Sequence, residues 1–318
     1  MSAEHPIIAI TGSSGSGINE VTRAFDQILW NLRARGVFVE GNAFHRYDRA
    51  EMKEQIKKAS AVGRNLSHYG PEGNMLDKLD SLFFEYAATG RGKSRHYLHT
   101  LEQAQLFGQK PGTFTEWSDI ENPTDLLLYK GLHGAAIVDD VDIGAYPDLL
   151  IGMTPNVNLE WIRKIRRDTD ERGYSQKQVR KSILRRLPDY VNHITPQFAR
   201  THINFQTISS IDTSDPFNQD RFPTQEECFV IIHNQKRVID NFHELVHEIP
   251  DAFMSRPDSM VVPGGSLKLA IERILMPKIR ELVDRGRQLR GDQPCPEGVR
   301  CGLIGRIQHE EEFYAETG

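Results

Sequence analysis

The stretch that decides the fold is ITGSSGSGINEVTRAF, residues 10–25. Its glycines Gly12 and Gly17 fit the phosphate-loop pattern G-x-x-x-x-G-K-[ST], and the apolar residues just before it are typical of a short buried strand. Such glycines let backbone N–H groups approach phosphate oxygens, and the following helix directs its positive dipole end at the same anion. The pattern predicts a nucleotide-phosphate site made of Gly12, Ser13, Ser14, Gly15, Ser16, Gly17, Ile18, Asn19 and Glu20.

The positions after the last glycine depart from this pattern. A lysine against the outer phosphates and a hydroxyl for magnesium are expected there, but the chain has Ile18 and Asn19, followed by Glu20. Neither side chain supplies the missing cation or hydroxyl. Taken alone, the stretch also fits a simple turn between a strand and a helix, so both interpretations stay open here.

Composition excludes several classes of protein. The 318 residues, 38% apolar and 26% charged, can bury one large core or two modest ones. The formal charge of −5 gives no global attraction to nucleic acid, and no apolar run approaches the ~20 residues that span a bilayer. Because MSAEHP does not resemble a secretory signal, we expect a cytoplasmic protein without nucleic-acid or membrane partners.

The three cysteines fit neither a disulfide framework nor a zinc site. Two of them, Cys295 and Cys301, lie in CPEGVRC near the end of the chain. They are interpreted either as solvent-exposed thiols or as a small redox loop.

Apolar runs of four to six residues alternate with helical patterns along the chain. This order predicts an α/β protein with a P-loop nucleotide-binding fold, in which a mixed, mostly parallel sheet is flanked by helices. We expect one kinase-like domain over residues 1–290, including a helical lid region. Residues 291–318 are predicted to be a poorly ordered tail with little core of its own.

Residues 163–186 contain ten basic side chains against three acidic ones. A solvated helix face is one interpretation. Basic residues on adjacent helical turns, with a break at Gly173, would also form a movable clamp over phosphates, which is the lid we expect.

Several stretches together resemble the bacterial phosphoribulokinases. They are HPIIAITGSSGSG, VEGNAFHRYDRAEM, GKSRHYLH, LYKGLHGA, NLEWIRKIRRDTDERGYS, ITPQFARTHINFQ and MVVPGG, in order from about residue 5 to 280. That family uses ATP and Mg²⁺ to phosphorylate D-ribulose 5-phosphate in the Calvin cycle, and its bacterial members are homo-oligomers. The resemblance therefore implies a nucleotide and a sugar phosphate as ligands, and a homo-oligomer.

The resemblance also implies roles for basic residues that this chain retains. Three stand where the family contacts the sugar phosphate, three stand in its lid, and two stand near subunit contacts and effectors. A neighbouring aspartate matches a family carboxylate associated with magnesium. The residues at the sugar phosphate are His45, Arg49 and Lys53, and those in the lid are Lys164, Arg167 and Arg172. Arg186 and Arg256 stand near subunit contacts and effectors, and the aspartate is Asp168.

Two catalytic positions of the family are replaced. The family motif EGDxFHR reads EGNAFHR, with Asn42 in place of the base that takes the proton from the sugar hydroxyl. An amide has no basic lone pair near neutral pH, so general-base help worth ~10²–10⁴ in rate is lost. The family motif YEGLHG reads YKGLHG, with Lys130 in place of a glutamate on the metal side.

Losses at the base, the metal side and the phosphate loop together favour a pseudokinase. It would keep its phosphate-ligand clefts and act in regulation, including as a partner of an active sister kinase. The alternative is a working phosphoribulokinase that uses other residues for the base and metal roles. Glu20 and Lys130 are expected either to pair with each other in the nucleotide site or to point separately to solvent.

Overall fold

The structure is a computed structural model, and it describes residues 4–13, 16, 18–154, 156–170, 173–217, 221–296 and 301–307. Its centre is a nine-stranded sheet in the order β11-β12-β10-β9-β8-β1-β5-β2-β13. The strands of this sheet are β1 (Ile7–Thr11), β2 (Arg35–Glu40), β5 (Leu126–Gly131), β8 (Leu149–Thr154), β9 (Ile203–Ser209), β10 (Cys228–His233), β11 (Phe253–Arg256), β12 (Ser259–Pro263) and β13 (Gly302–Ile304). Two small two-stranded antiparallel sheets are formed by β3 (Lys93–Ser94) with β4 (Ser118–Asp119) and by β6 (Ile137–Val138) with β7 (Val141–Asp142).

The strands from β13 to β9 run parallel to their neighbours. The strands β10, β12 and β11 extend the sheet in antiparallel fashion. The prediction of an α/β fold with a mixed, mostly parallel sheet is therefore confirmed.

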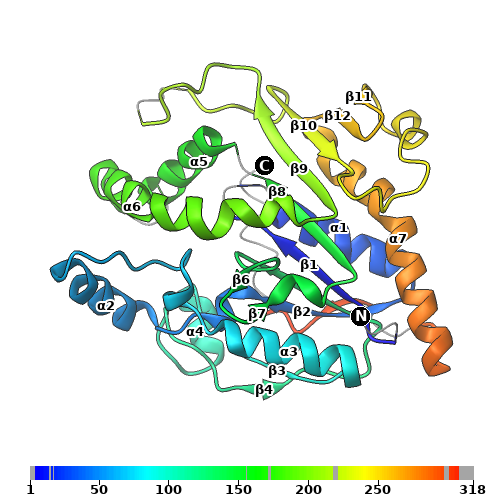
Figure 1. The fold of residues 1–318 in the computed structure, drawn as a ribbon, viewed down its shortest axis with the longest axis horizontal. Helices are drawn as coiled ribbons and strands as arrows, with labels where there is room; N and C mark the ends of the chain where they lie inside the picture. Colours follow the sequence, from blue (N-terminus) through cyan, green and yellow to red (C-terminus); the bar gives the residue numbers. More distant parts are fainter. Residues whose placement is uncertain are drawn as a thin grey trace.

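Both faces of the sheet are covered by helices, as Figure 1 shows. The seven α-helices in the described part of the chain are α1 (Ile18–Asn31), α2 (Arg49–Ala61), α3 (Leu76–Thr89), α4 (Leu101–Leu106), α5 (Val157–Asp170), α6 (Gln176–Asp189) and α7 (Leu267–Arg290). Side chains alternate across β1, since successive residues of a strand face opposite sides. Ile8 and Ile10 pack in the cluster that includes α1 and α7, whereas Ile7 and Ala9 pack in the cluster that includes α3.

The parallel arrangement places the carboxyl ends of β1, β2, β5 and β8 at one edge of the sheet. In Figure 1 this edge faces the side of the molecule where α2, α5 and α6 lie. Ligands of open α/β sheets bind outside the carboxyl ends of the strands, so this edge is where the candidate site is sought. No helix among the described residues is long and apolar enough to cross a membrane.

The end of the chain corrects one expectation. Gly302–Ile304 forms β13, which pairs with β2 in the register Gly302 to Arg35 through Ile304 to Val37. Leu303 is 6% exposed and belongs to the main core cluster. The prediction of a poorly ordered tail without core of its own is wrong for these residues, because a three-residue edge strand leaves little periodic signal in a sequence.

Candidate functional site

The phosphate loop begins where β1 ends. The backbone N–H of Gly12 donates to the carbonyl oxygen of Gly131 (3.0 Å), which joins the loop to the end of β5. A Cβ at Gly12 would lie 2.8 Å from the Cβ of Met153, so only glycine fits here. Ser16 closes the turn by donating from its backbone N–H and its hydroxyl to the carbonyl oxygen of Ser13 (3.1 and 2.7 Å).

Part of the predicted loop lies outside the described residues. This applies to Ser14, Gly15 and Gly17 and to the side chain of Asn19. Arg172, which was expected in the lid, also lies outside the described residues. Ile18, at the position where the pattern has lysine, is 4% exposed and packs in the main core cluster. Its side chain therefore supplies no charged group to a phosphate.

Glu20, just after the loop, and Lys130, on β5, have partners other than those predicted. Glu20 forms an ion pair with Arg23, one helical turn along α1 (3.2 Å). The ammonium Nζ of Lys130 lies 3.1 Å from Oε1 of Glu40. These ion pairs correct the expectation that Glu20 and Lys130 either pair with each other or both point to solvent.

The Lys130–Glu40 pair lies at the edge of the sheet where β5 and β2 end. The two residues are register partners in neighbouring parallel strands, so their side chains leave the sheet on the same side. The side chains are 14% and 20% exposed. Burial acts to raise the pKa of Glu40, but the Lys130 ammonium and nearby histidines outweigh it and hold this pKa below its usual value. The pair is therefore a salt bridge with little access to water.

Asn42 lies two residues beyond Glu40, in the 3₁₀ turn Gly41–Phe44. Its amide Nδ2 is 3.0 Å from Nε2 of His99. Because an amide nitrogen only donates, His99 accepts at Nε2. The turn itself is held by Arg95, whose guanidinium donates to the carbonyl oxygens of Ala43 and His45 (2.8 Å each).

His45 belongs to a buried cluster of histidines. Its ring stacks on His68 at a centroid distance of 3.8 Å, and its Nδ1 lies 2.8 Å from Oδ1 of Asn74. The amide nitrogen of Asn74 donates to backbone oxygens, so Oδ1 is the acceptor and Nδ1 of His45 carries the proton. Burial and the neighbouring His68 lower the pKa of His45 well below its usual value. His45 is thus held neutral, with Nε2 as an acceptor suited to a hydroxyl.

Arg49 and Lys53 lie on α2 with exposed side chains. The guanidinium of Arg49 donates to the carbonyl oxygen of His99 (2.9 Å), which brings the start of α2 beside the segment that contacts Asn42. The structure therefore gathers Asn42, Arg49 and His99 in one place.

Lys164 and Arg167, two of the residues expected in the lid, both contact Asp168, the aspartate expected near magnesium, on α5. The Lys164 ammonium binds Oδ2 of Asp168, and the Arg167 guanidinium binds Oδ1 (3.1 and 3.2 Å). Burial and the charge of Arg186 lower the pKa of Lys164 to about 8, although Asp168 acts to raise it. Asp168 is 6% exposed, and both of its oxygens are already paired with cations.

The two residues expected near subunit contacts lie far apart in the fold. Arg186, on α6, stands over the ring of Tyr69 at 5.2 Å and affects the pKa of Lys164. It therefore lies close to Lys164. Arg256 is exposed at the end of β11, the edge strand opposite β13.

The carboxylates near this site already have partners within the protein. Mg²⁺ is usually bound through one or two carboxylates together with substrate phosphates. Here Glu40 is paired with Lys130, Asp168 is paired with Lys164 and Arg167, and the buried Glu160 accepts from the hydroxyl of Tyr190 (3.3 Å). Within the described ranges, no group of three or more His, Cys, Asp or Glu side chains could hold a metal ion.

Sequence reasoning missed Glu40 and His99. Both lie in stretches already singled out, VEGNAFHR and GKSRHYLH. Aligning the ends of the two predicted parallel strands would have placed Glu40 opposite Lys130. No sequence signal indicated that His99, 57 residues from Asn42, would contact it.

Comparisons with known proteins agree with the fold. Residues 7–214 match the model of the phosphoribulokinase / uridine kinase family. The chain is 49% identical over 291 residues to the chromosomal phosphoribulokinase of Cupriavidus necator, covering 91% of this chain and 99% of that protein. It is 45% identical over 284 residues to a probable phosphoribulokinase of Escherichia coli, covering 89% and 98%.

Among solved structures, the phosphoribulokinase from Rhodobacter spheroides is similar, with a TM-score of 0.82 and 42% sequence identity. The match covers 90% of this chain and 100% of that one. The sheet and these similarities over most of the sequence lead to one conclusion. The chain belongs to the phosphoribulokinase family.

Proposed function

We propose that this protein binds a nucleotide and a sugar phosphate at the site of a phosphoribulokinase but turns them over slowly or not at all. The observation that carries the proposal is the Lys130–Glu40 ion pair, at 3.1 Å, where β5 and β2 end. Such a protein acts by sensing its ligands, either as a homo-oligomer or together with an active sister kinase. Its proposed ligands are intracellular metabolites, so we place it in the cytoplasm.

The charges at the edge of the sheet support this proposal. Glu40, Asn42 and Lys130 sum to zero, whereas a site with aspartate and glutamate at the last two positions would carry three negative charges. Phosphoryl transfer depends almost entirely on positioning and on charge placed around the transferring group. A site whose acids are neutralised by protein cations has lost the field that attracts a divalent ion.

The same charges favour the binding of anions without a metal. We expect the Lys130 ammonium to exchange its contact with Glu40 for phosphate oxygens when a nucleotide binds, and Arg49 presents an exposed guanidinium beside His99. Arginine and lysine both bind phosphate strongly, arginine through a planar fork and lysine as a compact point charge. ATP or ADP is therefore expected to bind with little help from Mg²⁺.

Calorimetry tests this. ADP and ATP are titrated into the protein with excess Mg²⁺ and, separately, with a chelator. We expect dissociation constants that agree within about threefold. The variant Lys130→Glu is the matched control, since restoring an acid beside Glu40 should make binding depend on Mg²⁺. A loss of tenfold or more on chelation in the unaltered protein would mean that a working metal site exists and that the proposal is wrong.

A second candidate function is a slow phosphoribulokinase in which His99 takes the role of base. The contact between Nε2 of His99 and the amide of Asn42 favours it, because an imidazole nitrogen can accept a proton where an amide cannot. If this function holds, His99→Gln should abolish a measurable turnover of ATP with ribulose 5-phosphate. An unaltered protein without turnover rules this candidate out.

A further inference from the structure

The backbone turn at Arg33–Ala34, between α1 and β2, binds the chain at Cys295 and next to Cys301. The N–H of Cys295 donates to the carbonyl oxygen of Arg33 (3.0 Å), and the N–H of Gly302, next to Cys301, donates to the carbonyl oxygen of Ala34 (2.9 Å). The guanidinium of Arg33 in turn donates to the carbonyl oxygen of Cys295 from Nε and Nη2 (3.0 and 2.7 Å). Successive residues of a single turn thus hold both ends of the segment 295–301.

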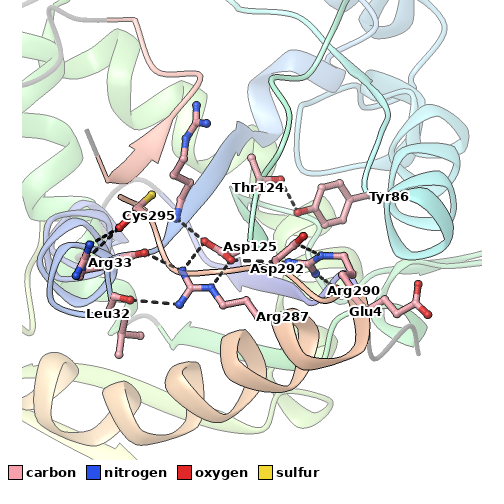
Figure 2. Close-up of polar contacts among 11 residues, drawn as sticks. Glu4, Leu32, Arg33, Tyr86, Thr124, Asp125, Arg287, Arg290, Asp292 and Cys295 are labelled. Atoms are coloured by element: carbon pink, nitrogen blue, oxygen red, sulfur yellow. Dashed lines mark hydrogen bonds and ion pairs between the residues drawn. The ribbon is translucent and has the colours of Figure 1, made fainter. Parts of the chain in front are cut away.

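That turn is itself fixed by a buried ion pair, which Figure 2 shows. The Arg287 guanidinium binds both oxygens of Asp125 (2.7 and 2.9 Å) and also donates to the carbonyl oxygen of Arg33 (2.7 Å). The N–H of Arg35 donates to the same Asp125 carboxylate (2.8 Å). Arg287 is 6% exposed, so the support for the two cysteines is part of the folded core.

The two thiols are in contact. Cys295 is 7% exposed and shares a hydrogen bond with the thiol of Cys301, which is partly exposed. All three cysteines of the chain are thiols in the structure, and Cys228 lies elsewhere, in β10. From the shared backbone support and this contact, we propose that Cys295 and Cys301 are a redox-active dithiol that a low-molecular-weight disulfide, such as oxidised glutathione, converts to an intrachain disulfide.

The reaction proceeds in two exchanges. The more exposed Cys301, as thiolate, attacks oxidised glutathione, forms a mixed disulfide and releases one glutathione thiolate. Cys295 then gives up its proton to water and attacks Sγ of Cys301, which releases the second glutathione. Two protein thiols are oxidised and one glutathione disulfide is reduced to two thiols. Burial and the adjacent Cys301 raise the pKa of Cys295 to about 11, so the second exchange is expected to accelerate with pH.

A disulfide between Cys295 and Cys301 would hold β13 on the sheet. Cys301 directly precedes β13, whose three residues form an edge strand beside β2. A covalent link between Cys295 and Cys301 would keep the start of this strand beside the Arg33–Ala34 turn. The residues that follow β13 line a small cavity with Phe38 and Glu40, so the redox state of the pair would act next to the candidate site.

The test uses the full chain treated with oxidised glutathione and then with an alkylating reagent, followed by peptide mass spectrometry. We expect one peptide pair linked through Cys295 and Cys301, lighter by two hydrogens, reversed by dithiothreitol, and with Cys228 still alkylated. Cys228→Ser should behave as the unaltered protein does. Cys295→Ser should stop at a glutathione adduct on Cys301.

The equilibrium between dithiol and intrachain disulfide is then measured again in concentrated urea. This comparison distinguishes a disulfide favoured by the folded structure from one favoured only by the short separation of the two cysteines in sequence. The ratio of intrachain disulfide to dithiol at a given glutathione poise should be at least tenfold higher in the folded protein. Amide exchange of Leu303 and Ile304 should slow on oxidation. Equal ratios in folded and unfolded protein, or glutathione adducts on both cysteines without a link between them, would overturn the proposal.

Discussion

Replacing Lys130 by methionine removes the ammonium that neutralises Glu40 while keeping most of the side-chain volume. With unit charges 3.1 Å apart and an effective dielectric constant of about 20, their attraction is about 5 kcal/mol. The cost of withdrawing both charges from water offsets much of this, and the side chains remain 14% and 20% exposed. We therefore expect Lys130→Met to lower the free energy of unfolding by about 2 kcal/mol.

Urea denaturation of four proteins measures the pair directly. They are the unaltered chain, Lys130→Met, Glu40→Gln and the double variant, and they form a double-mutant cycle. We expect the two single changes to cost more together than the double variant does, with a coupling energy of about 1–3 kcal/mol. Coupling below about 0.5 kcal/mol would refute the reasoning, because the pair would then be an incidental contact.

The same pair predicts a pH dependence of the coupling. The pKa of Glu40 in the folded protein lies below the ordinary 4.5. The stabilisation is therefore present above pH 4.5 and is lost as the pH falls through the lower, folded-state pKa. In Lys130→Met this acid-sensitive contribution should disappear.

Three further predictions concern ligand binding, acid stability and turnover. Arg49→Ala should weaken binding of a sugar phosphate at least about tenfold in a titration, whereas Lys57→Ala on the same helix should not; equal affinities would refute the assignment of Arg49. Burial lowers the pKa of His68 and His133 from 6.5 to about 4, so below pH 6.5 the unfolded chain binds more protons than the folded one. The free energy of unfolding, measured by urea denaturation, should therefore fall by about 2 kcal/mol between about pH 7 and 5.5. A midpoint that does not change over this range would contradict the conclusion that the buried His68 and His133 rings are neutral. Asn42→Asp alone should not restore phosphorylation of ribulose 5-phosphate in a coupled assay, and full rescue by this single change would show that the base is the sole defect.

Much of the fold follows from patterns that are local in sequence. The apolar runs at β1, β2, β5 and β8 are short and uninterrupted, as buried parallel strands require, and the glycines after β1 mark the phosphate loop. The strand β13 escaped prediction because it has three residues and is held by pairing with β2 rather than by its own periodicity.

The candidate site was predictable in its substitutions but not in its contacts. Asn42 and Lys130 stand out in motifs that resemble those of the family. The partner of Lys130 depends on the register between parallel strands, and the alternative partner, Glu20, instead meets Arg23 one turn along its own helix. The Asn42–His99 contact joins segments 57 residues apart, so only the folded arrangement reveals it.

The central claim is that phosphate ligands bind while phosphoryl transfer is impaired. The most direct measurement is turnover of ATP with ribulose 5-phosphate and Mg²⁺ by the unaltered protein, beside a variant combining Asn42→Asp, Lys130→Glu and Asn19→Ser. The account predicts a rate at least a hundredfold below the ~10 s⁻¹ typical of enzymes for the unaltered chain, and a gain in the combined variant. Turnover near ~10 s⁻¹ by the unaltered chain would contradict the account.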